Sequence, residues 1–263
     1  MLPDNLPFKI HVIHGYICNL YLLEYDQGLV LFDTGAANDV KRLERYMANH
    51  LQRSPDNIKL AVVSHAHPDH CGGAVLLRKK YNIPLAAHRN IDRWYAGPGG
   101  TLQHKLDIYM MLLVARSNKR HLERVLFDRQ VKPDYPLDDL DCLPMFPDWQ
   151  VFTTPGHTIH DIVLFNKDAG LLYASDLVLQ INDKYLPPLV VPFPDMMKQS
   201  LDRVSSLNPG TIMFAHGDIM DVNDPEAFFS SVKQALDLPM GMKKRVKKLS
   251  SFSPEIKNPG GRP

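Results

Sequence analysis

Cysteine is scarce in this chain of 263 residues, and its three cysteines, Cys18, Cys71 and Cys142, are widely spaced and odd in number. This pattern excludes a framework of disulfides. The net charge is only +1, which gives no reason to expect nucleic acid or an anionic membrane as a partner. No apolar run approaches the roughly 20 residues that span a bilayer. The first residues lack the basic region and apolar stretch of a signal peptide, so we expect a cytoplasmic protein.

The spacing of apolar residues predicts a chain of mixed α and β structure. Short apolar runs that end at Gly, Pro, Asp or Ser indicate strands, and apolar residues three or four apart indicate helices. The expected strands cover 8–14, 16–25, 29–32, 58–63, 83–87, 149–153, 161–166, 171–174 and 211–215. The expected helices cover 38–52, 72–80, 89–95, 102–127, 195–207 and 224–236. A break near 117–118 is an alternative for the long helix at 102–127. The stretch 132–147 is rich in Pro and Asp and is expected to be a loop.

The length is compatible with one large domain, which we expect over residues 1–240. A helical insert is predicted at about 97–130, after the flexible sequence Gly-Pro-Gly-Gly. Its apolar run 108–115 is too continuous for a helix that is exposed on one side. A buried or dimer-forming helix pair explains this run, and a cap over an active site is the alternative. The segment 241–263 is expected to be a basic, flexible tail.

The sequence Ser-His-Ala-His-Pro-Asp-His at 64–70 follows an apolar strand and is the strongest local signal. In an extended segment His65 and His67 project to the same face, so both imidazoles can bind one cation. Pro68 favours a turn, after which Asp69 and His70 can face a second position nearby. Imidazole and carboxylate ligands together suit a borderline divalent ion, with zinc as the first choice.

Polar residues follow the carboxyl ends of several predicted strands. They are Asp33, the cluster 65–70, His157, Asp176 and His216. Because sites in sheet proteins collect at strand ends, these residues can converge on one edge of the sheets.

The order of these motifs resembles the metallo-β-lactamase superfamily. The match consists of His-x-His-x-Asp-His at 65–70, Pro-Gly-His at 155–157, Ser-Asp at 175–176 and a final His at 216. The resemblance implies an α/β (α+β) fold, a four-layer αββα sandwich with two metals at one edge of the sheets. It also implies the metal ligands: His65, His67 and His157 for the first ion, Asp69, His70 and His216 for the second, and Asp176 as the bridge between them. Asp33 would not bind a metal itself but would orient one of the ligands or the helix that follows the histidine cluster.

Such a site predicts a hydrolase. Two divalent cations about 3.5–4 Å apart clamp the oxygens of a displacement and lower the pKa of bound water toward about 7. Asp69 is placed to take up the proton and return it to the leaving group, so we expect it to be catalytic. Two divalent ions per chain are expected, with zinc first and iron or manganese as alternatives. His160, three residues after His157, is expected to support a ligand or to line the pocket.

Differences between this sequence and the motifs of individual branches of the superfamily reduce the number of reactions to consider. A β-lactamase usually has Cys or Ser at the position of Asp176, and the di-iron oxygen-reducing branch has an acid at that of His67. The sequence 154–158 and the bridging Asp resemble the glyoxalase II and lactonase branches, although the chain after His216 is short for a full glyoxalase II. The lactonase branch has a catalytic Tyr soon after the bridging Asp. Tyr185 is the nearest candidate, but its spacing differs.

These departures favour a metallo-hydrolase that cleaves a small ester-like bond: a thioester, a lactone or an ester. The alternatives are a phosphodiesterase of the same fold, an enzyme like the persulfide dioxygenases with one iron, and a non-catalytic member that serves interactions. We expect a small-molecule substrate, no nucleic-acid or membrane partner, and a homodimer through the helical insert as one option.

Overall fold

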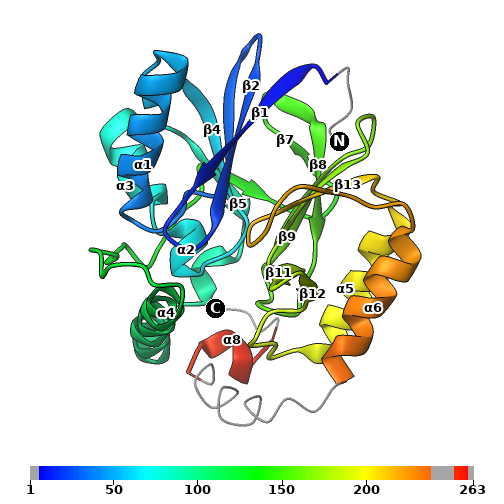
Figure 1. Ribbon diagram of the computed structural model, residues 1–263. Helices are drawn as coiled ribbons and strands as arrows, with labels where there is room; N and C mark the ends of the chain where they lie inside the picture. The colour runs from blue at the N-terminus through cyan, green and yellow to red at the C-terminus, as the bar shows by residue number, and fades with distance from the viewer. Residues whose placement is uncertain (1–5, 238–251, 260–263) are drawn as a thin grey trace. The chain divides into compact units, whose positions relative to one another are not determined.

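The computed structural model describes residues 6–237 and 252–259, and contacts within it divide the chain into two compact units (Figure 1). The N-terminal unit covers Leu6–Leu137, and the C-terminal unit contains the described residues from Asp138 onward. In the part of the chain that is described, each unit has a six-stranded sheet with helices.

The sheet of the N-terminal unit changes from antiparallel to parallel at β3. Its strands, in spatial order, are β1 (Phe8–His14), β2 (Asn19–Tyr25), β3 (Gly28–Phe32), β4 (Ile58–Val63), β5 (Leu85–His88) and β6 (Tyr135–Leu137). The first three strands are antiparallel, whereas β3 to β6 run parallel. Strand β4 is almost entirely apolar and buried, which is typical of a parallel strand covered on both faces.

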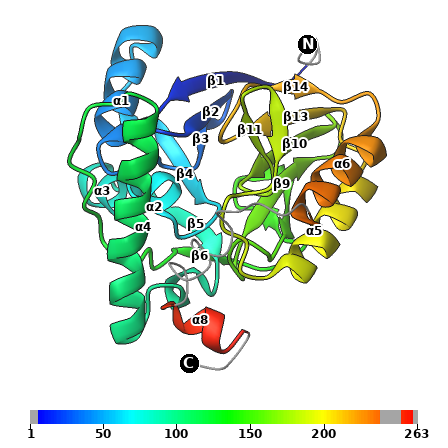
Figure 2. The same ribbon diagram turned by 60° about the horizontal axis from the view of Figure 1, so that its bottom comes forward.

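Helices α1 (Asp39–Tyr46), α2 (Pro68–Cys71) and α3 (Ala74–Tyr81) lie on one side of this sheet (Figures 1 and 2). A π-helical turn, Met47–Leu51, extends α1, and short 3₁₀ turns cover Pro55–Asn57 and Ile91–Arg93. The helix predicted at 89–95 is therefore only one 3₁₀ turn. The segment is too short to form a stable helix without an apolar face of its own.

The insert contains one long helix, α4 (Gly97–Ser117), which contacts α2. It begins earlier than predicted, and Pro98 in its first turn suits a helix start. It also ends earlier, because Lys119 adopts a left-handed conformation with φ of 57°. Residues 118–134 contain neither helix nor strand. The structure agrees with the predicted break near 117–118, and the alternative of one continuous helix to 127 is wrong.

The sheet of the C-terminal unit is mostly antiparallel. Its strands, in spatial order, are β14 (Met220–Asp221), β13 (Thr211–Phe214), β10 (Leu171–Ser175), β9 (Ile162–Asn166), β8 (Phe146–Thr153) and β7 (Cys142–Leu143). Only the neighbours β10 and β13 run parallel among the described strands of this sheet. A separate hairpin contains β11 (Leu179–Ile181) and β12 (Lys184–Leu186).

Helices α5 (Pro194–Ser206) and α6 (Pro225–Asp237) cover one face of this sheet (Figure 2). Their apolar side chains form one buried cluster with those of the strands, among them Leu201, Val204, Phe229, Leu172 and Ile212. The predicted helices 195–207 and 224–236 are confirmed to within one residue at each end. Their amphipathic spacing determined them locally.

The short strands β6, β7, β11, β12 and β14 were not predicted from the sequence. The stretch 132–147, expected to be a loop, contains β6, β7 and the start of β8, so that expectation is wrong in part. Strands of two or three residues show no measurable alternation and form because a neighbouring strand offers hydrogen bonds. The short helix α8 (Pro254–Lys257) belongs to the predicted tail. The basic residues 243–248 lie outside the described residues, so the flexible tail stays a prediction. The single domain over residues 1–240 also stays a prediction. Within 6–237 and 252–259, no helix has both the length and the apolar character required to span a membrane.

Candidate metal centre

The first half of the predicted ligand set lies where two parallel strands of the N-terminal unit end. Asp33 follows β3 directly and has φ of 55°, a left-handed conformation that Asp tolerates. Ser64 follows the neighbouring strand β4. The two carboxylate oxygens of Asp33 accept hydrogen bonds from the backbone N and from Oγ of Ser64, both at 2.8 Å. Asp33 therefore connects the two strand ends from which the histidine cluster begins.

Asp33 also holds the imidazole of His70. Its Oδ2 lies 2.6 Å from Nδ1 of His70, and both side chains are fully buried. The other ring nitrogen, Nε2, lies 3.6 Å from Oδ2 of Asp69. A carboxylate on the outer nitrogen is the usual partner of a metal-binding histidine. Asp33 thus contacts the outer ring nitrogen of a candidate ligand, and its role in orienting a metal ligand stays a prediction.

His65 and His67 direct one nitrogen each toward the other. Nε2 of His65 lies 3.0 Å from Nδ1 of His67, as expected for residues two apart in an extended segment. His67 is extended, with φ −70° and ψ 151°, because the residue before a proline avoids helical conformation. The outer nitrogen of His65, Nδ1, is 3.1 Å from Oγ of Ser64.

The chain turns sharply after this cluster, and a glycine makes the turn possible. A Cβ on Gly72 would lie 2.3 Å from the carbonyl oxygen of Pro68 and 2.8 Å from the backbone N of Ala37. Thr34 donates to the carbonyl oxygen of His70 from both its backbone N and its Oγ1, at 2.8 Å each. The turn that carries Asp69 and His70 is therefore packed closely against the loop after β3.

The second half of the ligand set lies in the C-terminal unit. Asp176 follows β10 and His216 follows β13, the two parallel neighbours of that sheet. Oδ1 of Asp176 is 3.3 Å from Nε2 of His216, and Oδ2 is 3.4 Å from Nε2 of His157. Each oxygen of one carboxylate therefore faces a different imidazole. That is the arrangement expected of a carboxylate shared by two ions.

His157 is positioned by a hydrogen-bonded loop after β8. Because β9 is antiparallel to both β8 and β10, those two strands end at the same edge of the sheet. Nδ1 of His157 is 2.7 Å from the carbonyl oxygen of Val190, so Nε2 is the nitrogen toward Asp176. The carboxylate of Asp161 accepts from N and Oγ1 of Thr158, both at 2.6 Å, and burial raises its pKa.

These distances fit metal ligands. Two ligand atoms about 2.1 Å from a zinc ion at tetrahedral angles are about 3.4 Å apart. The candidate pairs within each unit are separated by 3.0 to 3.6 Å. The donors are imidazole nitrogens and carboxylate oxygens, and three of the outer nitrogens have fixed partners in Asp33, Ser64 and Val190. Each unit therefore contains half of a ligand set suited to a borderline divalent ion.

Comparison with known proteins decides the family. A sequence profile of the metallo-β-lactamase superfamily matches residues 15–216. The chain belongs to this superfamily. The fold class predicted from the sequence is confirmed, whereas the glyoxalase II and lactonase branch stays a prediction.

Curated relatives of this superfamily member include two proteins of Bacillus subtilis. The chain is 21% identical to the probable metallo-hydrolase YflN over 230 residues, which are 79% of this chain and 83% of that protein. It is 25% identical to the probable metallo-hydrolase YqgX over 164 residues, 62% and 66% of the two chains.

Solved structures show the same fold. A metallo-β-lactamase family protein of Thermus thermophilus, TTHA1429, superposes with a TM-score of 0.66 at 19% identity, covering 86% of this chain and 78% of that one. The archaeal superfamily protein ST1585 of Sulfolobus tokodaii has a TM-score of 0.63 at 19% identity, with 93% and 96% covered. TTHA1623 in a di-iron-bound form has a TM-score of 0.56 at 21% identity, with 81% and 94% covered.

Two further predicted site residues of this metallo-β-lactamase superfamily member have other partners. His160 is fully buried, and its Nδ1 lies 3.2 Å from Oε2 of Glu255 in α8. The ring of Tyr185 packs against Phe214 at 5.4 Å and Phe228 at 5.2 Å between centroids. Tyr185 is thus a partly buried side chain packed against the core of the C-terminal unit, and a role for it at the metals stays a prediction.

One residue near the candidate ligands was missed in the sequence. Oδ2 of Asp107 in α4 lies 3.7 Å from Nε2 of His67. The available signal was a single carboxylate directly before the apolar run 108–115 of the insert. The sequence alone does not say which way that carboxylate points.

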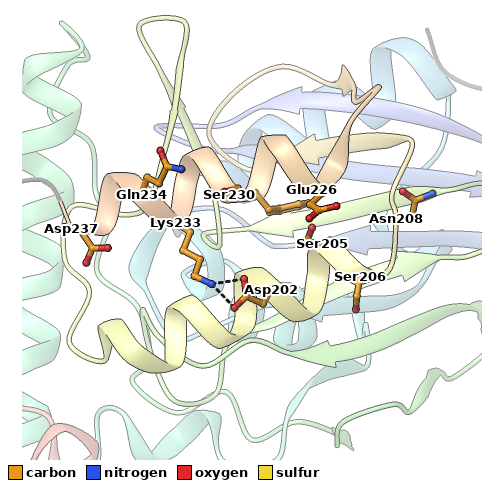
Figure 3. Close-up of a pocket in the computed structure, with 10 residues that line it drawn as sticks. Asp202, Ser205, Ser206, Asn208, Glu226, Ser230, Lys233, Gln234 and Asp237 are labelled. Atoms are coloured by element: carbon orange, nitrogen blue, oxygen red, sulfur yellow. Dashed lines mark hydrogen bonds and ion pairs between the residues drawn. The ribbon is translucent and has the colours of Figure 1, made fainter.

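A surface pocket lies between α5 and α6, and none of the predicted metal-binding residues lines it (Figure 3). Its wall includes serines, Glu226 and an ion pair in which Nζ of Lys233 lies 2.6 Å from Oδ2 of Asp202. The lining is polar and contains no histidine, and its ion pair is solvent-exposed, where such a pair contributes little to stability.

Proposed function

We propose that this superfamily member is a dinuclear metal-dependent hydrolase that cleaves a small ester-like bond. The single observation that carries the proposal is the carboxylate of Asp176, whose two oxygens face two different imidazoles at 3.3 and 3.4 Å. A carboxylate that serves one ion has no need of a second imidazole on its other oxygen. Two ions bridged by Asp176 account for both contacts.

In this proposal the two halves of the ligand set bind the same pair of ions. The ligands are His65, His67 and His157 for the first ion, Asp69, His70 and His216 for the second, and Asp176 for both. Zinc suits the mixture of imidazole and carboxylate, and iron is the first alternative because TTHA1623 has a di-iron-bound form.

The chemistry divides between the ions and the protein. Two bound divalent ions would supply Lewis acidity and a water of lowered pKa. Oδ2 of Asp69 would hold the proton that the attacking water loses and return it to the leaving group. Asp33 would hold Nδ1 of His70 at 2.6 Å and so direct the opposite ring nitrogen, Nε2, away from the Asp33 carboxylate. The substrate class is a thioester, a lactone or an ester in the cytoplasm.

The test combines metal analysis with a substrate panel on one preparation. We expect two zinc equivalents per chain and hydrolysis of a thioester, lactone or ester. His67→Ala and Asp176→Ala should each lower activity more than about 100-fold, because loss of a ligand exceeds the effect of losing its outer partner. His14→Ala is the matched control, since His14 is an exposed histidine that contacts Asn19.

Three results would contradict the proposal. One iron per chain with oxygen consumption would indicate a redox enzyme, and hydrolysis of phosphodiesters alone would indicate a phosphodiesterase. Full activity of His67→Ala or Asp176→Ala would place the site elsewhere.

A further inference from the structure

Three hydrogen-bond donors hold the carboxylate of Asp107 in one position. Nε1 of Trp94 and the hydroxyl of Tyr95 donate to Oδ2 at 3.2 and 2.9 Å. Nε2 of Gln103, a fully buried side chain, donates to Oδ1 at 2.7 Å. The side chain of Asp107 is only 13% exposed. A carboxylate with three donors on two oxygens has little freedom to move.

The oxygen that accepts two of these bonds also faces a candidate metal ligand. Oδ2 of Asp107 lies 3.7 Å from Nε2 of His67, the nitrogen opposite the one directed at His65. This separation is an ion-pair distance, longer than a hydrogen bond. The indole of Trp94 stands edge-on to the same imidazole, with ring centroids 5.6 Å apart and an angle of 83°. His67 is therefore bounded on one side by Trp94 and at its outer nitrogen by Asp107.

The chemistry of imidazole gives this contact a consequence. A neutral imidazole carries one N–H, so a histidine that binds a cation through Nδ1 has its proton on Nε2. Binding through Nδ1 makes that N–H more positive and strengthens its attraction to a nearby carboxylate. A carboxylate fixed beside Nε2 favours the tautomer in which Nδ1 is free to bind.

We propose that Asp107 is a positioning residue that acts through His67. The carboxylate of the insert helix α4 orients this imidazole and selects its tautomer, as Asp33 does for His70. The insert therefore contributes to metal affinity through one side chain. The proposal rests on the proposed metal site, because its effect is measured as metal binding.

A structural role for Asp107 makes a different prediction. If the carboxylate only anchored Trp94, Tyr95 and Gln103, its removal would lower the stability of the metal-free protein and leave metal affinity unchanged. Metal affinity and stability are therefore measured on the same variants. A buried carboxylate acting on an imidazole changes the first, and a packing anchor changes the second.

The experiment uses the purified full-length chain, stripped of metal and titrated with zinc against a chromogenic chelator. Asp107→Ala should lower the affinity for one of the two zinc equivalents by about 10- to 100-fold, the effect typical of removing the outer partner of a ligand. Asp107→Asn keeps an oxygen acceptor and should lose less. The thermal midpoint of the metal-free protein is recorded for each variant.

Two controls separate the explanations. Lys105→Ala changes an exposed side chain of the same helix and should leave both zinc affinities unchanged. Tyr95→Phe removes one donor to Asp107 but leaves its carboxylate beside His67, so it should lower the thermal midpoint more than it lowers affinity.

Unchanged zinc affinity in Asp107→Ala would overturn the inference, and so would an equal loss in Lys105→Ala. If the parent protein binds two zinc ions and the Asp107 variants bind them with the same affinity, the inference fails while the proposed function stands. If the parent binds no zinc or iron, both fail.

Discussion

At the scale of single residues, the orientation of each imidazole depends on the partner of its outer nitrogen. Asp33 engages Nδ1 of His70, Ser64 contacts Nδ1 of His65, and the carbonyl of Val190 accepts from Nδ1 of His157. Each partner leaves Nε2 as the nitrogen available to a metal. His67 alone among these four histidines offers Nδ1 toward its neighbour, and it has Asp107 at Nε2.

His104 provides a prediction about pH. It lies in the insert, and burial first and the positive charge of Arg129 second lower its pKa from 6.5 to about 4. Among the described residues its Nε2 has no hydrogen-bond partner. The unfolded chain therefore binds a proton more tightly than the folded chain between about pH 6.5 and 4, and the free energy of unfolding falls as the pH falls through this window.

The contribution of His104 is at most about 3.5 kcal/mol, because each pKa unit corresponds to about 1.4 kcal/mol. Urea unfolding of the metal-free protein at pH 7 and at pH 4.5 measures it. His104→Leu should lose less stability than the parent over this interval, and at neutral pH the two proteins should differ by packing alone. Equal losses in both proteins would show that His104 is not the titrating group.

At the scale of elements, α8 shows how a helix of one turn is maintained. So short a helix is unstable in isolation. Oγ of Ser253 accepts from the backbone N of Glu255 at 3.3 Å, and the side chain of Glu255 is 1% exposed. Its carboxylate reaches His160, three residues after a candidate metal ligand. The element exists because of this distant partner.

Removing the carboxylate of Glu255 should destabilise the protein. Glu255→Ala removes the carboxyl group that faces the fully buried imidazole of His160 and leaves this imidazole without that partner, so we expect a loss of about 2–4 kcal/mol in the free energy of unfolding. The measurement is equilibrium unfolding in urea. Lys257→Ala, an exposed change in the same helix, should alter stability by less than about 0.5 kcal/mol. Similar stability of the two variants would mean that the pair does not hold α8.

At the scale of the whole molecule, α4 has two apolar faces. One face packs inward through Ile108, Met111 and Ala115. The other carries Leu102, Leu106, Tyr109 and Leu113 at spacings of four, three and four, the pattern of a coiled-coil seam. Three of these four side chains are exposed, and exposed apolar stripes commonly mark interfaces. This second face is the surface that we propose for a homodimer through the insert.

Light scattering during size-exclusion chromatography tests the homodimer. We expect a dimer at micromolar concentration for the parent and a monomer for the double variant Tyr109→Glu/Leu113→Glu, because two buried carboxylates per chain would face each other. Leu122→Glu is the control, since Leu122 is 75% exposed and lies beyond the end of α4. A monomeric parent, or a double variant that remains dimeric, would exclude this interface.

Much of the candidate site was predictable because it is written in short segments. The pair His65 and His67 is set by the two-residue period of an extended chain, and the turn at Pro68 by the geometry of proline. The ends of β4, β10 and β13 follow from apolar runs of four to six residues. Contacts between Asp33 and Ser64, or between Asp176 and His216, then follow from the parallel pairing of adjacent strands.

The sequence by itself therefore determined the superfamily, the fold class, the order of the candidate ligands and the strand ends that carry them. The tertiary structure decided which ring nitrogen of the candidate ligands His65, His70 and His157 is engaged by an outer partner, and that Asp107 and Glu255 reach His67 and His160. The physical reason is range. Covalent geometry and apolar periodicity act over a few residues, whereas these side-chain partners lie 40 and 95 residues apart and meet only when the chain has packed.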